Sequence, residues 1–239
     1  MKGVILSIAP DVQIVDITHG ISSQNVEEAA FVLKRVYSYF PEGTIHVVVV
    51  DPGVGSERAA LAVRTKKYTF LAPDNGVLKY VFDDHAEAEV FRVTNRAIFL
   101  ERVSRTFHGR DVFAPVAAHL SRGMKVEEVG ERFSEYVRGE VRKPVIESQE
   151  ISGEIIYIDK FGNGITNIGE VLLVGRNVLR VQIGSTAVHG LSQTYLDVPV
   201  GSPLALIGSG GTLELSVHRG SGKERLGFRV GDPVAVVLK

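Results

Sequence analysis

Two polar segments of the sequence carry residue types that could activate or bind a small molecule. The first, DPGVGSER at residues 51–58, joins the carboxylate of Asp51 to the guanidinium of Arg58 through glycines that permit close backbone approach. The second, TFHGRD at residues 106–111, places His108 among polar groups just before an expected helix. A plain turn explains the first segment as well as a ligand-binding loop does, and a lone histidine is more often structural than catalytic.

The second half of the chain holds a third polar segment and a flexible turn. The segment places Asp159, Phe161 and Asn163 close together, which is more than a hairpin requires. Ser209 lies in a glycine-rich turn before the strand that carries Glu214. Because Glu214 alternates with leucines on either side, we expect it on a solvated outer face. Spacing alone supports at most a ligand at the boundary between two domains.

The composition excludes several classes of chemistry and partner. With 27 basic and 28 acidic side chains the net charge is −1, which argues against binding to nucleic acid or to a membrane surface. The absence of cysteine excludes disulfides, thiolate nucleophiles and cysteine-ligated zinc. The histidines lack metal-ligand spacing, so no metal site is expected. No apolar run approaches the length of a membrane span and no signal peptide is recognisable, which predicts a soluble, cytoplasmic protein.

Hydrophobic patterning predicts an N-terminal α/β domain over residues 1–142, which positions the first two polar segments. The uninterrupted apolar run TIHVVVV before Asp51 is typical of a strand buried on both faces, so we expect a mostly parallel sheet under helices. A turn at PDNG leads into a helix, and Asp111 is expected to cap another. The expected elements are helices at 1–8, 25–40 and 111–121 and strands at 14–18, 44–50, 59–64 and 68–71.

A composition change at Arg142–Gln149 is typical of a linker, after which the pattern becomes all-β. The runs there are short and β-branched, with glycine or proline between them and no helical period. Residues 150–239 are therefore predicted to form a small antiparallel β-barrel domain. The expected strands are 151–158, 178–183, 204–207, 212–217 and 233–238.

Five segments, taken in order, resemble one enzyme family. They are DPGVGSER, PDNG, FHGRDVFAP, DKFGNGITN and SGGTLELSV. Together they are similar to the S-adenosylmethionine (SAM) hydrolases, also called SAM hydroxide adenosyltransferases, which are relatives of fluorinase and chlorinase. The resemblance implies a two-domain subunit that assembles as a homotrimer and binds its ligand between neighbouring subunits. It also implies the reaction of S-adenosyl-L-methionine with water to give adenosine and L-methionine, without metal or cofactor.

The resemblance also assigns roles to individual residues. The catalytic set falls on Asp51, Arg58 and His108, which would hold a water in line with the C5′–S bond and raise its nucleophilicity. The PDNG residues Asp74 and Asn75 are expected to be structural or to support the contacting residues without touching the ligand. The substrate contacts implied by the match, with two neighbours from the same motif, are Asn163, Ser209, Glu214, Val217, Asp159 and Phe161.

The N-terminus departs from the family pattern. The family opens with a strand that ends in a TDFG segment, whose aspartate binds the ribose hydroxyls, whereas Met1 here falls on a later helical position. We expect that lack of this strand weakens SAM binding and destabilises the sheet. Either the start codon is assigned too far downstream or the chain is a truncated variant.

Two alternatives to a hydrolase stay open at this point. One is a SAM- or adenosine-binding protein that is inactive through loss of the opening strand. The other is a relative that uses halide as its nucleophile. The carboxylate of Asp51 would repel an anionic nucleophile, so the sequence favours water.

Overall fold

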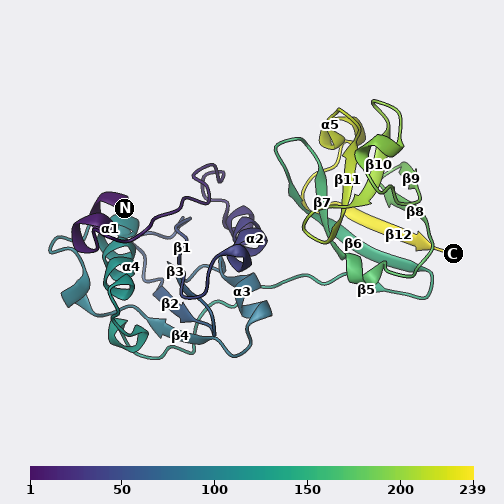
Figure 1. Cartoon of the computed structure of the whole chain (residues 1–239). Coiled ribbons are helices and arrows are strands. Elements are labelled where there is room, and N and C mark those ends of the chain that lie inside the picture. The colour runs from purple at the N-terminus through teal and green to yellow at the C-terminus, as the bar shows by residue number, and fades with distance from the viewer. The chain divides into compact units, whose positions relative to one another are not determined.

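The computed structural model describes all residues 1–239, which form two compact units, Met1–Val141 and Arg142–Lys239. Each unit has its own sheet (Figure 1). Each also has its own hydrophobic core. None of the helices combines the length and apolar character needed to cross a membrane. The two units are described separately below.

Unit 1 contains a four-stranded mixed sheet in the order β1-β3-β2-β4. Strand β1 (Ile45–Val47) runs parallel to β3 (Thr69–Pro73), whereas β2 (Ala60–Arg64) runs antiparallel to both β3 and β4 (Glu89–Arg92). The expectation of a mostly parallel sheet is therefore wrong. The physical reason is the short turn between β2 and β3, because strands joined by so few residues can pair only in opposite directions.

A helical layer covers each face of this sheet. Successive side chains of β2 point to opposite faces, so they pack against different layers. Leu61 and Val63 pack with Leu33 in one core cluster, whereas Ala62 packs with Val116 in another. The α-helices of the unit, drawn in Figure 1, are α1 (Lys2–Ile8), α2 (Val26–Val36), α3 (Lys79–Asp84) and α4 (Ala114–Ser121). Short 3-10 turns occupy Tyr37–Tyr39, Arg96–Ile98 and Val126–Val129, and a π-helical turn, Gly109–Phe113, precedes α4.

Helix α2 begins where the sequence predicts. The Asn25 side chain accepts a hydrogen bond from the Glu28 amide at 3.1 Å, and the Glu28 carboxylate accepts one from the Ser22 amide at 3.1 Å. The strand expected at Ile14–Thr18 does not form. These residues have no pairing partner in the sheet, and several of their side chains are exposed.

Unit 2 is a nearly closed antiparallel sheet in the order β10-β11-β7-β6-β12-β8-β9, with β5 paired to β6. Ser192, shortly after β9, bridges to Leu206 of β10 and brings the two ends of the sheet together. A buried cluster that includes Ile155, Val181 and Leu215 fills the interior. The strands are β5 (Val145–Ile146), β6 (Glu150–Ile158), β7 (Gly164–Gly169), β8 (Val178–Ile183), β9 (Thr186–His189), β10 (Pro203–Ile207), β11 (Thr212–Val217) and β12 (Pro233–Leu238).

The five strands expected in this half are all present, so the barrel-like architecture follows from the short β-branched runs. The sequence pattern missed β5, which lies in the expected linker, and also β7 and β9. It also missed α5 (Gly222–Leu226), a single helical turn with Ser221 as its N-cap and Gly227 in the left-handed conformation at its end. A helix of five residues is too short to show a hydrophobic period.

Candidate functional site

The structure brings Asp51, Arg58 and His108 together in unit 1. Arg58 donates from Nε to Asp51 Oδ1 at 3.0 Å and from Nη2 to Asp51 Oδ2, so the guanidinium binds the carboxylate in a bidentate manner. The same Nη2 lies 3.0 Å from His108 Nδ1. The side chains of Asp51 and Arg58 are 5% and 10% exposed. Arg58 is thus the central member of a largely buried cluster.

The contact with Arg58 determines how His108 presents its ring. A guanidinium nitrogen can only donate, so His108 Nδ1 must accept, and the proton of the neutral ring resides on Nε2. Burial and the neighbouring Arg58 charge lower the pKa of His108, against an opposing effect of Asp51 and Asp111. The neutral imidazole therefore offers an Nε2–H donor to a ligand.

Two loops carry this cluster and touch each other directly. Asp51 follows the segment that continues from β1, and Asn75 Nδ2 holds the carbonyl of Val50, one residue earlier, at 2.9 Å. Gly55, in the left-handed conformation at φ +84°, lies against the carbonyl of Arg105 in the loop that leads to His108. The spacing of the cluster therefore depends on close backbone contact at Gly55.

Asp111 stabilises the loop before His108 rather than capping a helix. It is fully buried inside the π-helical turn, and its carboxylate accepts the Ser104 amide at 2.7 Å and the Arg110 guanidinium. These contacts keep the pKa of Asp111 below its usual range, mainly through Arg110. The expectation of an N-cap is wrong because the helix begins with a π turn in which Asp111 is already the third residue.

Asp74, from the same PDNG turn as Asn75, has a structural contact. Its Oδ1 accepts the Val137 amide at 2.8 Å, and burial raises the pKa of its carboxyl. It therefore joins the turn after β3 to the segment near the end of the unit.

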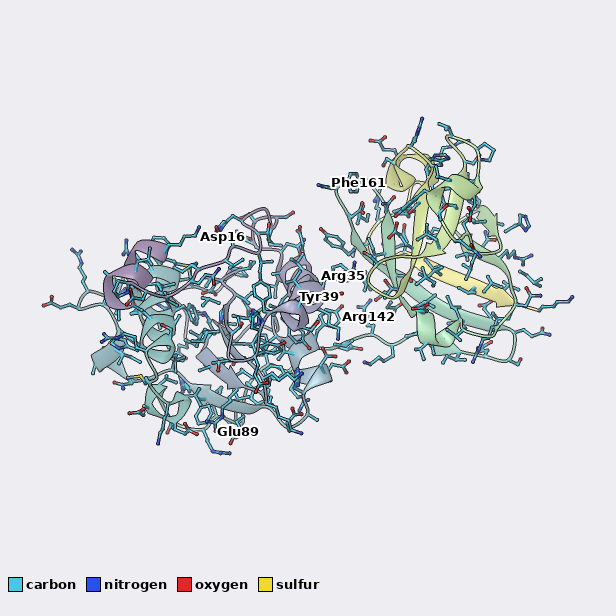
Figure 2. All side chains as sticks on the ribbon, in the orientation of Figure 1. Asp16, Arg35, Tyr39, Glu89, Arg142 and Phe161 are labelled. Carbon is cyan, nitrogen blue, oxygen red and sulfur yellow. The ribbon has the colours of Figure 1, made fainter.

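In unit 2, Asp159 organises the loop between β6 and β7. Its Oδ1 accepts the amides of Phe161 at 2.8 Å and Asn163 at 2.9 Å, and its Oδ2 accepts Asn163 Nδ2 at 3.0 Å. A carboxylate can only accept, so Asn163 must direct its Nδ2 to Asp159 and keep its amide oxygen for another partner. The ring of Phe161 is 65% exposed on this loop, where Figure 2 labels it.

Glu214 is buried, contrary to the expectation of a solvated face. It is 8% exposed, and its Oε1 accepts hydrogen bonds from Tyr195 at 2.6 Å and Ser216 at 2.7 Å. The alternation itself is correct, because Leu213 and Leu215 point into the barrel core. The chain between β9 and β10, which carries Tyr195, covers the outer face of β11 at this position.

Strand register places two of the predicted residues of unit 2 near each other. Glu214 of β11 pairs with Ile165 of β7, so it lies two positions along the register from Asn163, the residue just before β7. Ser209 lies in the exposed turn between β10 and β11, and Val217 is buried at the end of β11.

Sequence reasoning missed two residues that support these clusters, Tyr195 and Ser216, and gave Asp111 a capping role in place of its contact with the loop before His108. The signal for Ser216 was its position inside the motif that carries Glu214. Tyr195 lies far from any polar motif in sequence, and only the fold connects it to Glu214. No group of three or more acidic or histidine side chains is arranged to hold a metal ion.

Comparisons with known proteins agree with the order of motifs along the chain. The SAM hydroxide adenosyltransferase N-terminal domain model matches residues 1–130, and the corresponding C-terminal domain model matches residues 153–235. The (R)-S-adenosyl-L-methionine hydrolase of Thermus thermophilus is 36% identical, over 99% of this chain and 92% of its own. The fluorinase of Nocardia brasiliensis is 31% identical, over 92% of this chain and 85% of its own.

The solved structures include one of an uncharacterized conserved protein from Thermotoga maritima that has nearly the same fold. It superposes with a TM-score of 0.92 at 40% identity and covers 99% of this chain and 93% of its own. Both domain models match in the expected order, and relatives more than 30% identical span almost the whole chain. The chain therefore belongs to the SAM hydroxide adenosyltransferase family.

Proposed function

We propose that the chain hydrolyses S-adenosyl-L-methionine by attack of water at C5′, giving adenosine and L-methionine. The observation that carries this proposal is the Arg58-centred cluster with Asp51 and His108. Relatives that match over almost the whole of this chain are named (R)-S-adenosyl-L-methionine hydrolases, which supports the same substrate here.

The leaving group of the reaction needs no activation by the protein. A sulfonium departs as a neutral thioether, so neither a general acid nor a Lewis acid is needed there, and we propose that no metal or cofactor takes part. The protein has to hold a water in line with the C5′–S bond and accept its proton as the new C–O bond forms. Turnover that is unchanged by a chelator would support this part of the proposal.

Asp51 is the proton acceptor in this mechanism. His108 Nδ1 is occupied by Arg58, which leaves an Nε2–H that can only donate to the water oxygen. Each Asp51 oxygen has a further lone pair beside the one directed at Arg58. The carboxylate is a weak base, but the water becomes strongly acidic as it bonds to carbon, so a weak base is sufficient. Arg58 fixes the direction of the Asp51 carboxylate through its two hydrogen bonds.

The substrate contacts in unit 2 would follow from the groups that its side chains leave available. Asn163 offers its amide oxygen, and Phe161 offers an exposed ring for stacking on a flat ligand. Asp159 would act by shaping their loop. Glu214 would accept a donor or cationic group of the substrate.

Ser209 and Val217 complete the proposed set of contacts. Ser209 lies in the exposed turn of β10 and β11 and would contact the ligand through its hydroxyl. Val217 would act through its backbone, because its side chain is apolar and buried. We also propose that the chain assembles as a homotrimer with its sites at subunit interfaces, as the family resemblance implies. Light scattering on the purified protein would test this assembly.

The experiment is turnover of SAM in ¹⁸O-labelled water, followed by mass spectrometry. The names of the relatives specify the (R) form, so both sulfonium epimers are assayed separately. The expected product is adenosine with the label in its 5′-hydroxyl, and Asp51→Asn should abolish its formation while SAM still binds. SAM that stays intact although bound would identify a binding protein. A 5′-chloro product in the presence of chloride would identify a halide-using enzyme. Either result would overturn the proposal.

A further inference from the structure

The two oxygens of the Glu214 carboxylate have different environments. Oε1 accepts both the Tyr195 hydroxyl and the Ser216 hydroxyl, at 2.6 Å and 2.7 Å. Oε2 makes no hydrogen bond within the chain, and it is not among the buried polar atoms that lack a partner. It therefore keeps access to solvent. The protein thus orients the carboxylate through one oxygen and leaves the other for an external donor.

Tyr195 is held in place independently of Glu214. It begins a 3-10 turn that Thr194 caps by accepting the Leu196 amide at 3.1 Å. Asp197 closes the turn by accepting the Gln193 amide at 2.6 Å. Burial, followed by the Glu214 carboxylate, raises the pKa of Tyr195 to about 12, so the hydroxyl remains a donor at neutral pH.

Gly208 leaves the space that Oε2 requires. The turn between β10 and β11 begins at this residue, whose amide donates to the Thr212 carbonyl at 2.9 Å. A Cβ on Gly208 would lie 2.5 Å from Glu214 Oε2, which is too close for contact. The φ of Gly208 lies outside the left-handed region, so backbone conformation does not require glycine here. The need for glycine therefore arises from the neighbouring carboxylate oxygen.

We propose that Tyr195, together with Ser216, is a positioning residue for substrate binding: it fixes Glu214 through Oε1 so that Oε2 receives a hydrogen-bond donor of the substrate. The inference rests on the proposed function, in which Glu214 binds SAM. Tyr195 itself need not touch the substrate. Its contribution is to remove the rotational freedom of a carboxylate that would otherwise have to be ordered on binding.

The test compares Tyr195→Phe with the same change at Tyr39, an exposed residue of unit 1 that Figure 2 labels. The dissociation constant of adenosine is measured by calorimetry, and KM and kcat are measured with SAM. Loss of a hydrogen bond to a charged group should weaken adenosine binding and raise KM by about tenfold in Tyr195→Phe, with kcat within about twofold. Tyr39→Phe should match the wild type in all three.

Two further variants keep the test decisive if Tyr195→Phe folds poorly. Ser216→Ala removes the other donor to Oε1 and should also raise KM while kcat stays nearly constant. Gly208→Ala displaces Oε2 without removing either donor and should weaken adenosine binding at least as much. The melting temperature of each variant separates these effects from loss of fold.

The outcomes distinguish this inference from the proposed function. A wild-type chain that binds neither adenosine nor SAM would overturn both. A hydrolase whose KM and adenosine affinity are unchanged by Tyr195→Phe would overturn the positioning role alone. A fall in kcat at constant KM would also overturn it, because Tyr195 would then act on the chemical step.

Discussion

Replacement of Gly55 by alanine should separate the two loops that form the Arg58 cluster. Gly55 has φ +84°, and a Cβ there would fall well inside the contact distance of the Arg105 carbonyl oxygen. Backbone cannot rotate away as a flexible side chain can, so one loop has to move. Arg105 lies three positions before His108, and Gly55 lies between Asp51 and Arg58. Separation of the two loops therefore increases the distance between His108 on one loop and the Asp51–Arg58 pair on the other.

The magnitude has two components. A left-handed conformation costs a residue with a Cβ roughly 1–2 kcal/mol of folding free energy. To restore an ordinary carbon–oxygen contact of about 3.3 Å, the loops must move apart by roughly 1 Å. A displacement of about 1 Å between catalytic groups lowers rates by about a hundredfold, so kcat should fall to that extent.

Gly43 provides a matched control, because it has nearly the same φ, +86°, with no atom within 4 Å of the position of a Cβ. Gly43→Ala should lose the same 1–2 kcal/mol of stability, measured by urea unfolding, but keep its kcat. Gly55→Ala should lose more stability and about a hundredfold in kcat. Equal kcat values in the two variants would refute the argument that close contact at Gly55 sets the geometry of the cluster.

Three further predictions concern the histidines and Arg58. Arg58→Lys should lower kcat by about a hundredfold or more at nearly constant KM, because an ammonium lacks the planar fork that reaches both Asp51 oxygens and His108 Nδ1 from two nitrogens. A kcat within threefold of wild type would contradict this. Since the pKa of His108 is lowered from 6.5, activity should persist at pH 6.5 and fall only at lower pH, where a protonated Nδ1 can no longer accept from Arg58. The dependence of kcat/KM on pH checks this prediction. A loss of activity that already begins above pH 6.5 would contradict it.

The third prediction concerns His46, whose pKa is lowered by burial from 6.5 to about 4. The unfolded chain binds the proton first as pH falls, so stability should decrease between pH 6.5 and 4, by about 1–2 kcal/mol at pH 5. His46→Phe should remove this loss in urea unfolding, and an equal loss in the variant would assign it to other groups.

The sequence predicts well those features that depend on local contacts. Asn25 and Glu28 form their cap within one helical turn. Asp51 and Arg58 lie seven residues apart in one loop, so their pairing needs little help from the rest of the fold. The five strands of unit 2 likewise follow from their own composition.

Features that depend on distant segments were harder to predict. The apolar run before Asp51 indicates burial on both faces, but its strand β1 has a single parallel neighbour, β3, and the rest of the sheet is antiparallel. The residues at Ile14–Thr18 have the pattern of a strand, but a strand also needs a neighbour for its hydrogen bonds. The local sequence does not indicate whether that neighbour is present, and the structure has none there. The tautomer of His108 depends on Arg58, fifty positions away.

Glu214 shows why alternation along a strand does not determine exposure. The period of two correctly assigns Leu213 and Leu215 to the barrel interior and Glu214 to its outer face. Whether an outer face meets water depends on what crosses it, and here a non-adjacent segment places Tyr195 over the carboxylate. A polar side chain buried in this way must find partners, and the two hydroxyls on Oε1 supply them. Oε2 has no partner within the chain but reaches solvent, so it is the oxygen left for an external donor in the positioning role proposed for Tyr195.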